Sequence, residues 1–208
     1  MWSIIQAAGW PIWPLIIASI VALALIFERL YSLRQSMVAP AGMVDRVLAE
    51  FRQNGVTPEL LSRTAQQGPL GRILAAGLAN VRSPRPVMKE AIEEVGRVVT
   101  HELERFLTTL GTLAAMSPLL GLFGTVVGMI EIFGSQGGGN TNPAELAHGI
   151  STALYNTAAG LIVAIPSLMF YRYFRGRVDD YLHTLEQSSE QLLTQLMRVT
   201  AGRPGQTK

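Results

Sequence analysis

The stretch from Phe106 to Tyr171 contains 66 residues and neither a lysine nor an arginine. A basic side chain near the middle of a bilayer costs about 2.5 to 3.5 kcal/mol on insertion scales, so a long segment without one fits lipid better than water. The composition agrees, because 49% of the 208 residues are hydrophobic and only 15% are charged. We therefore expect an integral membrane protein.

The basic residues indicate the topology. All 17 lysines and arginines fall into two blocks, 11 between Arg29 and Arg105 and six between Arg172 and Lys208. Two blocks that flank apolar runs follow the positive-inside rule, whereas a nucleic-acid-binding surface would spread its charge. Three spans put both blocks on the inner side and the N-terminus outside.

The predicted segments follow from these boundaries. Each apolar run is about as long as the roughly 20 residues that cross a bilayer, or longer. Arg29 and Arg34 follow the first run instead of preceding it, so this run is an anchor and not a cleaved signal peptide. In order, we expect an outer N-terminus at 1–10, a first span at 11–31, an inner helical domain at 32–106, a second span at 107–133, an outer loop at 134–145, a third span at 146–171, and an inner C-terminal helix and tail at 172–208.

The inner segments have a helical pattern. An apolar stripe predicts one helix, and the sequence Thr57-Pro58-Glu59 gives a cap, an N1 proline and a first-turn acid for the next. The stripe consists of Met43, Val47, Leu48 and Phe51. Spacing of three and four residues continues from Pro86 to Phe133, which predicts one long helix, and from the third span to Leu196. Long protruding helices need partners, so we predict a cytoplasmic bundle within a homo-oligomeric ring.

Two threonines lie on faces made of small residues. At 100° per residue, Thr125 shares a face with glycines of the second span, and Thr157 shares one with small residues of the third. The predicted packing residues on these faces are Gly121, Gly124, Gly128, Ala153, Gly160 and Ala164. Small residues let membrane helices approach closely. Each hydroxyl either bonds its own helix backbone or a neighbouring helix, or it contributes to a polar lining, which we favour.

No carboxylate lies at mid-depth of these two spans. Their acids are Glu131 and Glu145, both near the predicted outer end. A threonine hydroxyl can orient water or a proton acceptor, but it does not ionise in this pH range. If protons cross here, an ionisable group must come from elsewhere. The sequence predicts no metal site, cofactor or catalytic residue, since His101, His148 and His183 share no ligand spacing.

The two motifs resemble a known family. MSPLLGLFGTVVGMIEIF at 116–133, followed by GISTALYNTAAGLIVAIPSLMFYRYF at 149–174, resembles the MotA/TolQ/ExbB proton channel family, and three spans resemble its ExbB/TolQ branch, most like ExbB. The resemblance implies a pentamer in the bacterial inner membrane with a periplasmic N-terminus and a cytoplasmic C-terminus. It also implies an ExbD- or TolR-like single-span partner with a transmembrane aspartate, and a TonB- or TolA-like protein that receives the work.

The resemblance assigns roles to single residues. Thr125 and Thr157 match the pore-lining threonines of the family, with Glu131, Thr152 and Asn156 as secondary polar contributors. Several family members have glutamate where this chain has Thr152, so a role for that carboxylate does not transfer. The partner's acid must then suffice, or Glu131 must substitute.

The expected function is that of a stator subunit that uses the proton-motive force to energise TonB-dependent outer-membrane transport. A TolQ-like subunit of the Tol-Pal envelope-maintenance system is the first alternative, and a non-conducting scaffold for a single-span partner is the second. A secondary transporter is disfavoured because three spans lack the paired repeats and broken helices of such folds. We do not expect an enzyme.

Overall fold

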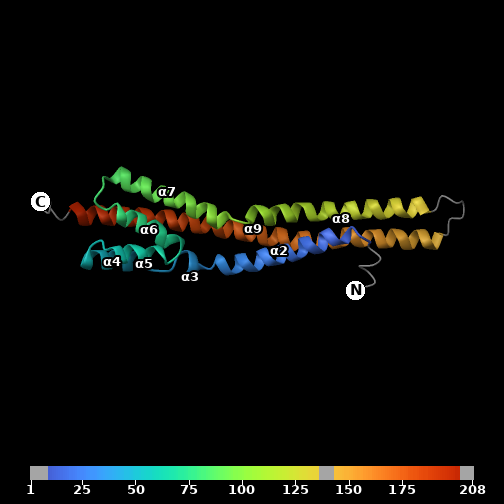
Figure 1. The fold of residues 1–208 in the computed structure, drawn as a ribbon, viewed down its shortest axis with the longest axis horizontal. Coiled ribbons are helices and arrows are strands. Elements are labelled where there is room, and N and C mark those ends of the chain that lie inside the picture. Colours follow the sequence, from blue (N-terminus) through green and yellow to red (C-terminus); the bar gives the residue numbers. More distant parts are fainter. Residues whose placement is uncertain (1–8, 136–142, 202–208) are drawn as a thin grey trace. The chain divides into compact units, whose positions relative to one another are not determined.

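The computed structural model describes residues 9–135 and 143–201, and the regular structure within these residues is helical. The predicted outer N-terminus, the outer loop and the end of the tail lie largely outside the described residues. The helices, labelled as in Figure 1, are α2 (Ile12–Ser32), α3 (Gln35–Val38), α4 (Met43–Asn54), α5 (Pro58–Ala65), α6 (Pro69–Ala79), α7 (Arg85–Glu104), α8 (Leu107–Ser135) and α9 (Pro143–Ala201).

The described residues fall into two compact units. Unit 1 combines the residues up to Arg29 with Phe106–Phe174, and unit 2 combines Leu30–Arg105 with the residues from Arg175 onward. Helix α9 contributes its first part to unit 1 and its second part to unit 2. By length and composition, α2, α8 and the first part of α9 can each cross a membrane. This supports a membrane protein with three spans, while the sides and depths of the segments stay predictions.

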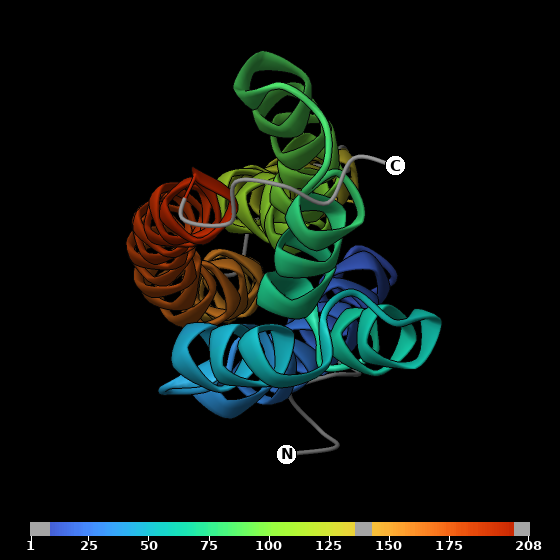
Figure 2. The ribbon, with the colours of Figure 1, turned by 90° about the vertical axis from the view of Figure 1, so that its left-hand side faces the viewer.

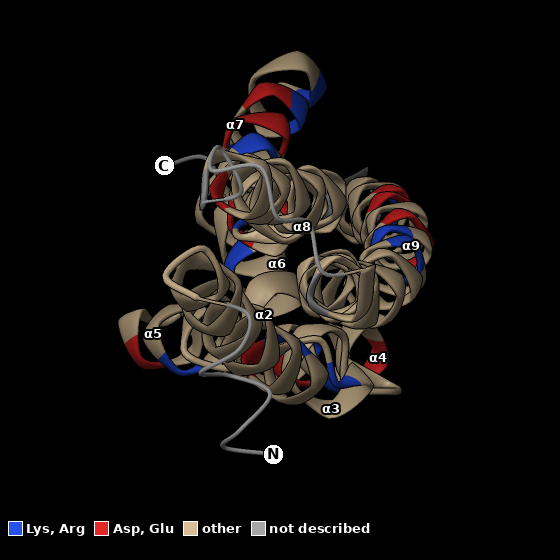
Figure 3. Ribbon diagram, turned by 90° about the vertical axis from the view of Figure 1, so that its right-hand side faces the viewer, with Lys and Arg blue, Asp and Glu red and all other residues tan. Residues whose placement is uncertain are grey.

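Unit 1 is built on close antiparallel packing of α8 against α9. Gly111 faces Tyr171, Gly121 faces Thr157, and Ile132 faces Gly149, so residue numbers rise along one helix as they fall along the other. The end-on view in Figure 3 shows how few charged residues this unit contains. Its charged residues are Glu28, Arg29, Glu131, Glu145 and Arg172.

Each of the two helices contains a proline beside a buried serine. Pro118 lies inside α8 and Pro166 inside α9, yet both helices continue through them. Ser117 donates a hydrogen bond of 2.6 Å to the carbonyl of Leu113, and Ser167 donates one of 2.7 Å to the carbonyl of Val163. Both serines therefore satisfy their hydroxyls within their own helix.

Unit 2 confirms the helical signals of the inner domain. The residues of the predicted stripe are all buried on α4. Thr57 caps α5, because its hydroxyl accepts the amide hydrogen of Leu60 at 3.1 Å, and Pro58 occupies the first turn. Figure 2 shows α6 between α7 and α5, and α6 contacts both of these helices.

The second part of α9 runs antiparallel to α7 within unit 2. Arg175 on α9 pairs with Glu104 at one end of α7, and Glu190 pairs with Arg85 at the other, each at 3.2 Å. On the other side of this interface, Leu192 is fully buried against Gly77 of α6. The predicted continuation of the third span into a long helix is confirmed, and its place on the inner side stays a prediction.

The prediction of one helix from Pro86 to Phe133 is wrong. Helix α7 ends at Glu104 and α8 begins at Leu107, because Phe106 adopts a left-handed backbone with φ of 64°. A non-glycine residue in this region costs about 1 to 2 kcal/mol. The guanidinium of the buried Arg29, which also pairs with Glu28 at 3.0 Å, lies 5.3 Å from the centre of the Phe106 ring. This cation–π contact helps hold Phe106 in place.

Candidate functional site: a hydroxyl pair between α8 and α9

The structure brings the two predicted threonines together. The hydroxyl oxygens of Thr125 on α8 and Thr157 on α9 lie 2.5 Å apart. The Thr125 hydroxyl oxygen also lies 3.2 Å from the carbonyl oxygens of Gly121 and Ala153, and that of Thr157 lies 3.4 Å from the Gly121 carbonyl oxygen. Each hydroxyl has one hydrogen and so donates to one of these acceptors at a time. Both half-buried hydroxyls therefore contact backbone and the neighbouring helix, which is the first of the two predicted roles, while the polar lining stays a prediction.

Glycines allow this approach. A Cβ atom on Gly121 would lie 2.7 Å from the Asn156 carbonyl oxygen and 3.0 Å from the Cα of Thr157. On Gly160 it would lie 2.5 Å from the carbonyl oxygen of Ser117. Real Cβ atoms essentially never come this close, so any larger residue would push the helices apart. The predicted packing residues Gly121, Gly124, Ala153, Gly160 and Ala164 are all buried, and Gly128 is half-buried against Ala153.

The secondary polar residues differ in their surroundings. Asn156 is only 1% exposed and lies against Gly124, next to the threonine pair. Thr152 is half-buried, and its hydroxyl donates to the carbonyl of Gly149 at 2.8 Å. Glu131 is exposed on α8. The side chain of Glu145 lies outside the described residues.

The site can relay or orient a proton but cannot store one as a charge. Its hydroxyls are donors and acceptors that stay neutral at physiological pH. Among the acids of unit 1 whose side chains are described, Glu28 pairs with Arg29 and Glu131 is exposed away from the pair. Among these described side chains, none supplies a carboxylate beside Thr125 and Thr157.

Sequence reasoning missed two features of this site. The apposition of Asn156 and Gly124 was not predicted, because a helical wheel gives the face of a residue but not its level along the partner helix. The bond from Ser117 to the carbonyl of Leu113 was also missed, although a serine inside a helix often donates to the carbonyl four residues earlier.

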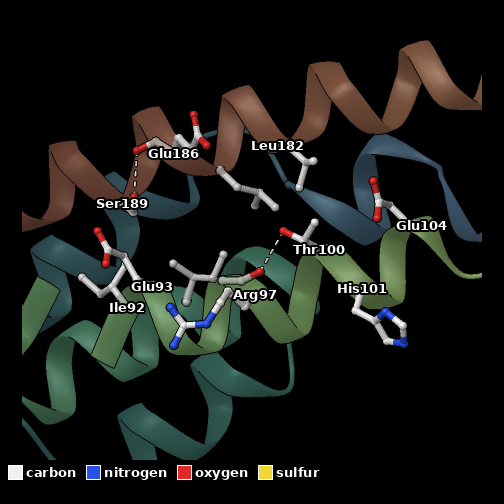
Figure 4. A pocket seen from close by; sticks show the side chains of 12 residues that line it. Ile92, Glu93, Arg97, Thr100, His101, Glu104, Leu182, Glu186 and Ser189 are labelled. Atoms are coloured by element: carbon white, nitrogen blue, oxygen red, sulfur yellow. Dashed lines mark hydrogen bonds between the residues drawn. The ribbon is translucent and has the colours of Figure 1, made fainter. Parts of the chain in front are cut away.

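Unit 2 contains a separate cavity of about 610 Å³ between α7 and the second part of α9. Ile92 and Leu185 are among its apolar lining residues, and Figure 4 shows that α7 contributes Glu93 and Arg97 while α9 contributes Glu186. The described residues contain no cluster of histidine and acidic side chains that could hold a metal ion, and His101, His148 and His183 are exposed. The mixed charges of this cavity assign no chemistry to it.

An ion pair connects α6 and α7 in the same unit. Arg72 donates two hydrogen bonds to Glu102, one of them 2.9 Å long. The hydrogen bonds from Arg72 hold the pKa of Glu102 below its ordinary value, although partial burial opposes this effect. The carboxylate in turn raises the pKa of Arg72. Both groups lie outside the candidate spans.

Comparison with known proteins places these helices among relatives. A family model described as the MotA/TolQ/ExbB proton channel family matches residues 65–187, which include α7, α8 and most of α9. An ExbB-like biopolymer transport protein of Synechocystis is 34% identical over 168 residues, covering 78% of this chain and 79% of the relative. Biopolymer transport protein exbB1 of Vibrio cholerae is 32% identical over 168 residues, covering 78% and 74%. Biopolymer transport protein ExbB of Salmonella typhimurium is 42% identical over 85 residues, covering 40% and 35%.

Proposed function

Because the chain belongs to the MotA/TolQ/ExbB proton channel family, we propose that it is the proton-channel subunit of an ExbB-ExbD-type motor in the bacterial inner membrane. In this proposal the chain forms a homopentamer around single-span helices of an ExbD-like partner. The assembly uses the proton-motive force to energise TonB-dependent transport across the outer membrane. The similarity to proteins named for biopolymer transport supports this assignment.

One observation carries the proposal. Thr125 and Thr157 form a hydrogen-bonded pair on a glycine-lined interface between two apolar helices, with no described carboxylate beside it. A structural interface in a membrane also avoids acids and keeps hydroxyls, so the proposal joins this geometry to the family membership of the chain. A hydroxyl pair suits the wall of a proton path whose titrating group, a partner aspartate, moves past it.

The proposed cycle has three steps. A proton enters from the outer side and reaches the partner aspartate, which the hydroxyls of Thr125 and Thr157 orient by donating hydrogen bonds. Protonation removes the charge that burial disfavours, so the partner helix can change its position within the ring. The proton then leaves on the inner side. Each charge that crosses contributes about 2.3 kcal/mol per 100 mV, so a large mechanical stroke needs several protons.

The test replaces both hydroxyls with groups of similar shape. We expect the Thr125→Val and Thr157→Val double variant to assemble with its partner but to lower proton flux into liposomes at least about tenfold, since a positioned proton-transfer group contributes on the order of 100-fold or more. Thr112→Val is the matched control, because this threonine is exposed on the same helix and bonds only the carbonyl of Thr108. Unchanged flux in the double variant would refute the assignment.

The same liposomes test the scaffold alternative, and an assay on cells tests the TolQ-like alternative. A non-conducting scaffold would bind the single-span partner and give no flux with or without it. A TolQ-like subunit would conduct but serve envelope maintenance, so its loss would sensitise cells to detergent without lowering energy-dependent uptake. Loss of uptake with an intact envelope supports the ExbB-type role.

A further inference from the structure

Asn156 fills a notch in the interface between α8 and α9, one residue before Thr157. A Cβ atom on Gly124 would lie 2.8 Å from both Cβ and Cγ of Asn156 and 3.0 Å from its Nδ2 atom. The pair of Gly124 and Asn156 and the pair of Thr125 and Thr157 thus occupy consecutive positions on both helices. Any side chain at position 124 would compete with the amide for the same space.

Burying an amide in this notch costs free energy. Asn156 is 1% exposed, and a carboxamide costs more to bury than a hydrocarbon group of similar size. In other helix interfaces, a buried polar side chain sets the register of the two helices, because other alignments leave it without suitable surroundings. A slip by one turn would bring the amide level with Leu120 and Gly121 or with Val127 and Gly128, and in either direction it would separate the hydroxyls of Thr125 and Thr157.

We propose that Asn156 is a positioning residue that locks the register of α8 on α9 through the Gly124 notch, so that the hydroxyls of Thr125 and Thr157 meet. The inference rests on the proposed proton path for its functional consequence. The register itself is a property of the interface alone. The two ideas can therefore fail separately.

The register is measured by disulfide formation. The chain contains no cysteine, and a Cβ atom on Gly128 would lie 3.1 Å from the Cβ of Ala153, slightly inside the range of about 3.5 to 4.5 Å that disulfides prefer. We expect Gly128→Cys with Ala153→Cys to cross-link rapidly on oxidation in the assembled complex. Adding Asn156→Leu should slow the cross-linking at least fivefold. In the cysteine-free complex, the same substitution should lower proton flux about tenfold, because a misplacement of about 1 Å can cost on the order of 100-fold.

A compensating pair covers the case in which Asn156→Leu does not assemble. Gly124→Ala crowds the amide and should lower flux about tenfold, and adding Asn156→Ser, which keeps a polar group of smaller size, should restore flux to within about threefold. Gly134→Ala is the control on the same helix, because its added Cβ meets nothing within 4 Å. Restoration supports the lock.

Two outcomes overturn the proposal. One is unchanged cross-linking and flux with Asn156→Leu, and the other is a Gly124→Ala defect that Asn156→Ser does not relieve. A third outcome would refute the proton path but support the role of Asn156 in helix register. In that outcome, cross-linking depends on Asn156, but the double threonine variant keeps full proton flux.

Discussion

In each unit, the interface of α9 with a neighbouring helix contains a glycine, but the atoms in contact with that glycine differ. In unit 1, Gly160 of α9 faces the backbone of α8, with the Ser117 carbonyl oxygen 2.5 Å from where a Cβ would stand. In unit 2, Gly77 of α6 faces the ends of side chains, with Leu192 Cδ2 at 2.8 Å and Ile92 Cδ1 at 3.1 Å. Backbone cannot move aside, whereas the end of a leucine can change its rotamer.

The predicted solvents, lipid for unit 1 and water for unit 2, would explain this difference. Hydrocarbon is as apolar as a leucine side chain, so helices in lipid gain little by burying leucines and associate through close backbone approach and hydrogen bonds instead. In water, burial of apolar area drives association at roughly 25 cal/mol per Å². Unit 2 accordingly buries Leu185, Leu192, Leu193 and Leu196 of α9 and places ion pairs at the rim.

The largest expected effect tests the side-chain core of unit 2. Leu192→Ala should lower the free energy of unfolding by about 2 to 5 kcal/mol, since it removes a fully buried side chain and leaves a cavity. Leu119→Ala in unit 1 is the comparison, because this leucine is 64% exposed on α8 and should change stability by less than about 0.5 kcal/mol. Thermal unfolding of the two variants in the same detergent measures both changes in stability. Equal losses of stability would contradict the contrast between the buried leucine of unit 2 and the exposed leucine of unit 1.

A smaller effect tests the backbone contact of unit 1. Gly160→Ala should destabilise by about 1 to 3 kcal/mol, because the added methyl group meets a carbonyl oxygen that is fixed in a helix. Gly77→Ala should cost less than about 1 kcal/mol, because leucine and isoleucine ends can shift and alanine favours the helix. Denaturation of the two alanine variants side by side gives the comparison. A larger loss at Gly77 than at Gly160 would reverse it.

The smallest effect concerns the rim of unit 2. The folded protein holds the pKa of Glu102 below its ordinary value through Arg72, so folding favours the ionised carboxylate. The stabilisation is therefore present above the ordinary carboxyl pKa of about 4.3 and is lost as the pH falls through the lowered pKa. Glu102→Gln should flatten the acid side of a plot of melting temperature against pH. Because the pair of Arg72 and Glu102 is partly exposed, the change should be small. If the melting temperature of the variant falls with acid in the same way as that of the original protein, the ion pair does not contribute to stability.

Local signals in the sequence predicted much of this structure. The cap at Thr57 and the stripe on α4 depend on residues close together in the chain, so their chemistry is readable directly. The faces of Thr125 and Thr157 follow from helical periodicity alone, and the structure turns them toward each other. The roles proposed for them are a separate matter, which the flux experiments address.

Nonlocal contacts explain the failures. The apolar spacing continues across Arg105 and Phe106, and neither residue is a glycine or proline, so nothing in the sequence marks the end of α7. The left-handed turn at Phe106 is stabilised instead by Arg29, which is 77 positions earlier in the chain. The level of Asn156 against Gly124 likewise depends on the sum of all contacts between two helices.

The prolines within α8 and α9 have a mechanical consequence. Each proline lacks an amide hydrogen, so the carbonyls four residues earlier, on Ala114 and Ile162, lose their usual donors from within the helix. A helical turn that lacks one backbone hydrogen bond bends more easily than the turns beside it. If the partner helix of the proposed motor pushes on α8 and α9 as it moves, we expect these helices to bend mainly at Pro118 and Pro166.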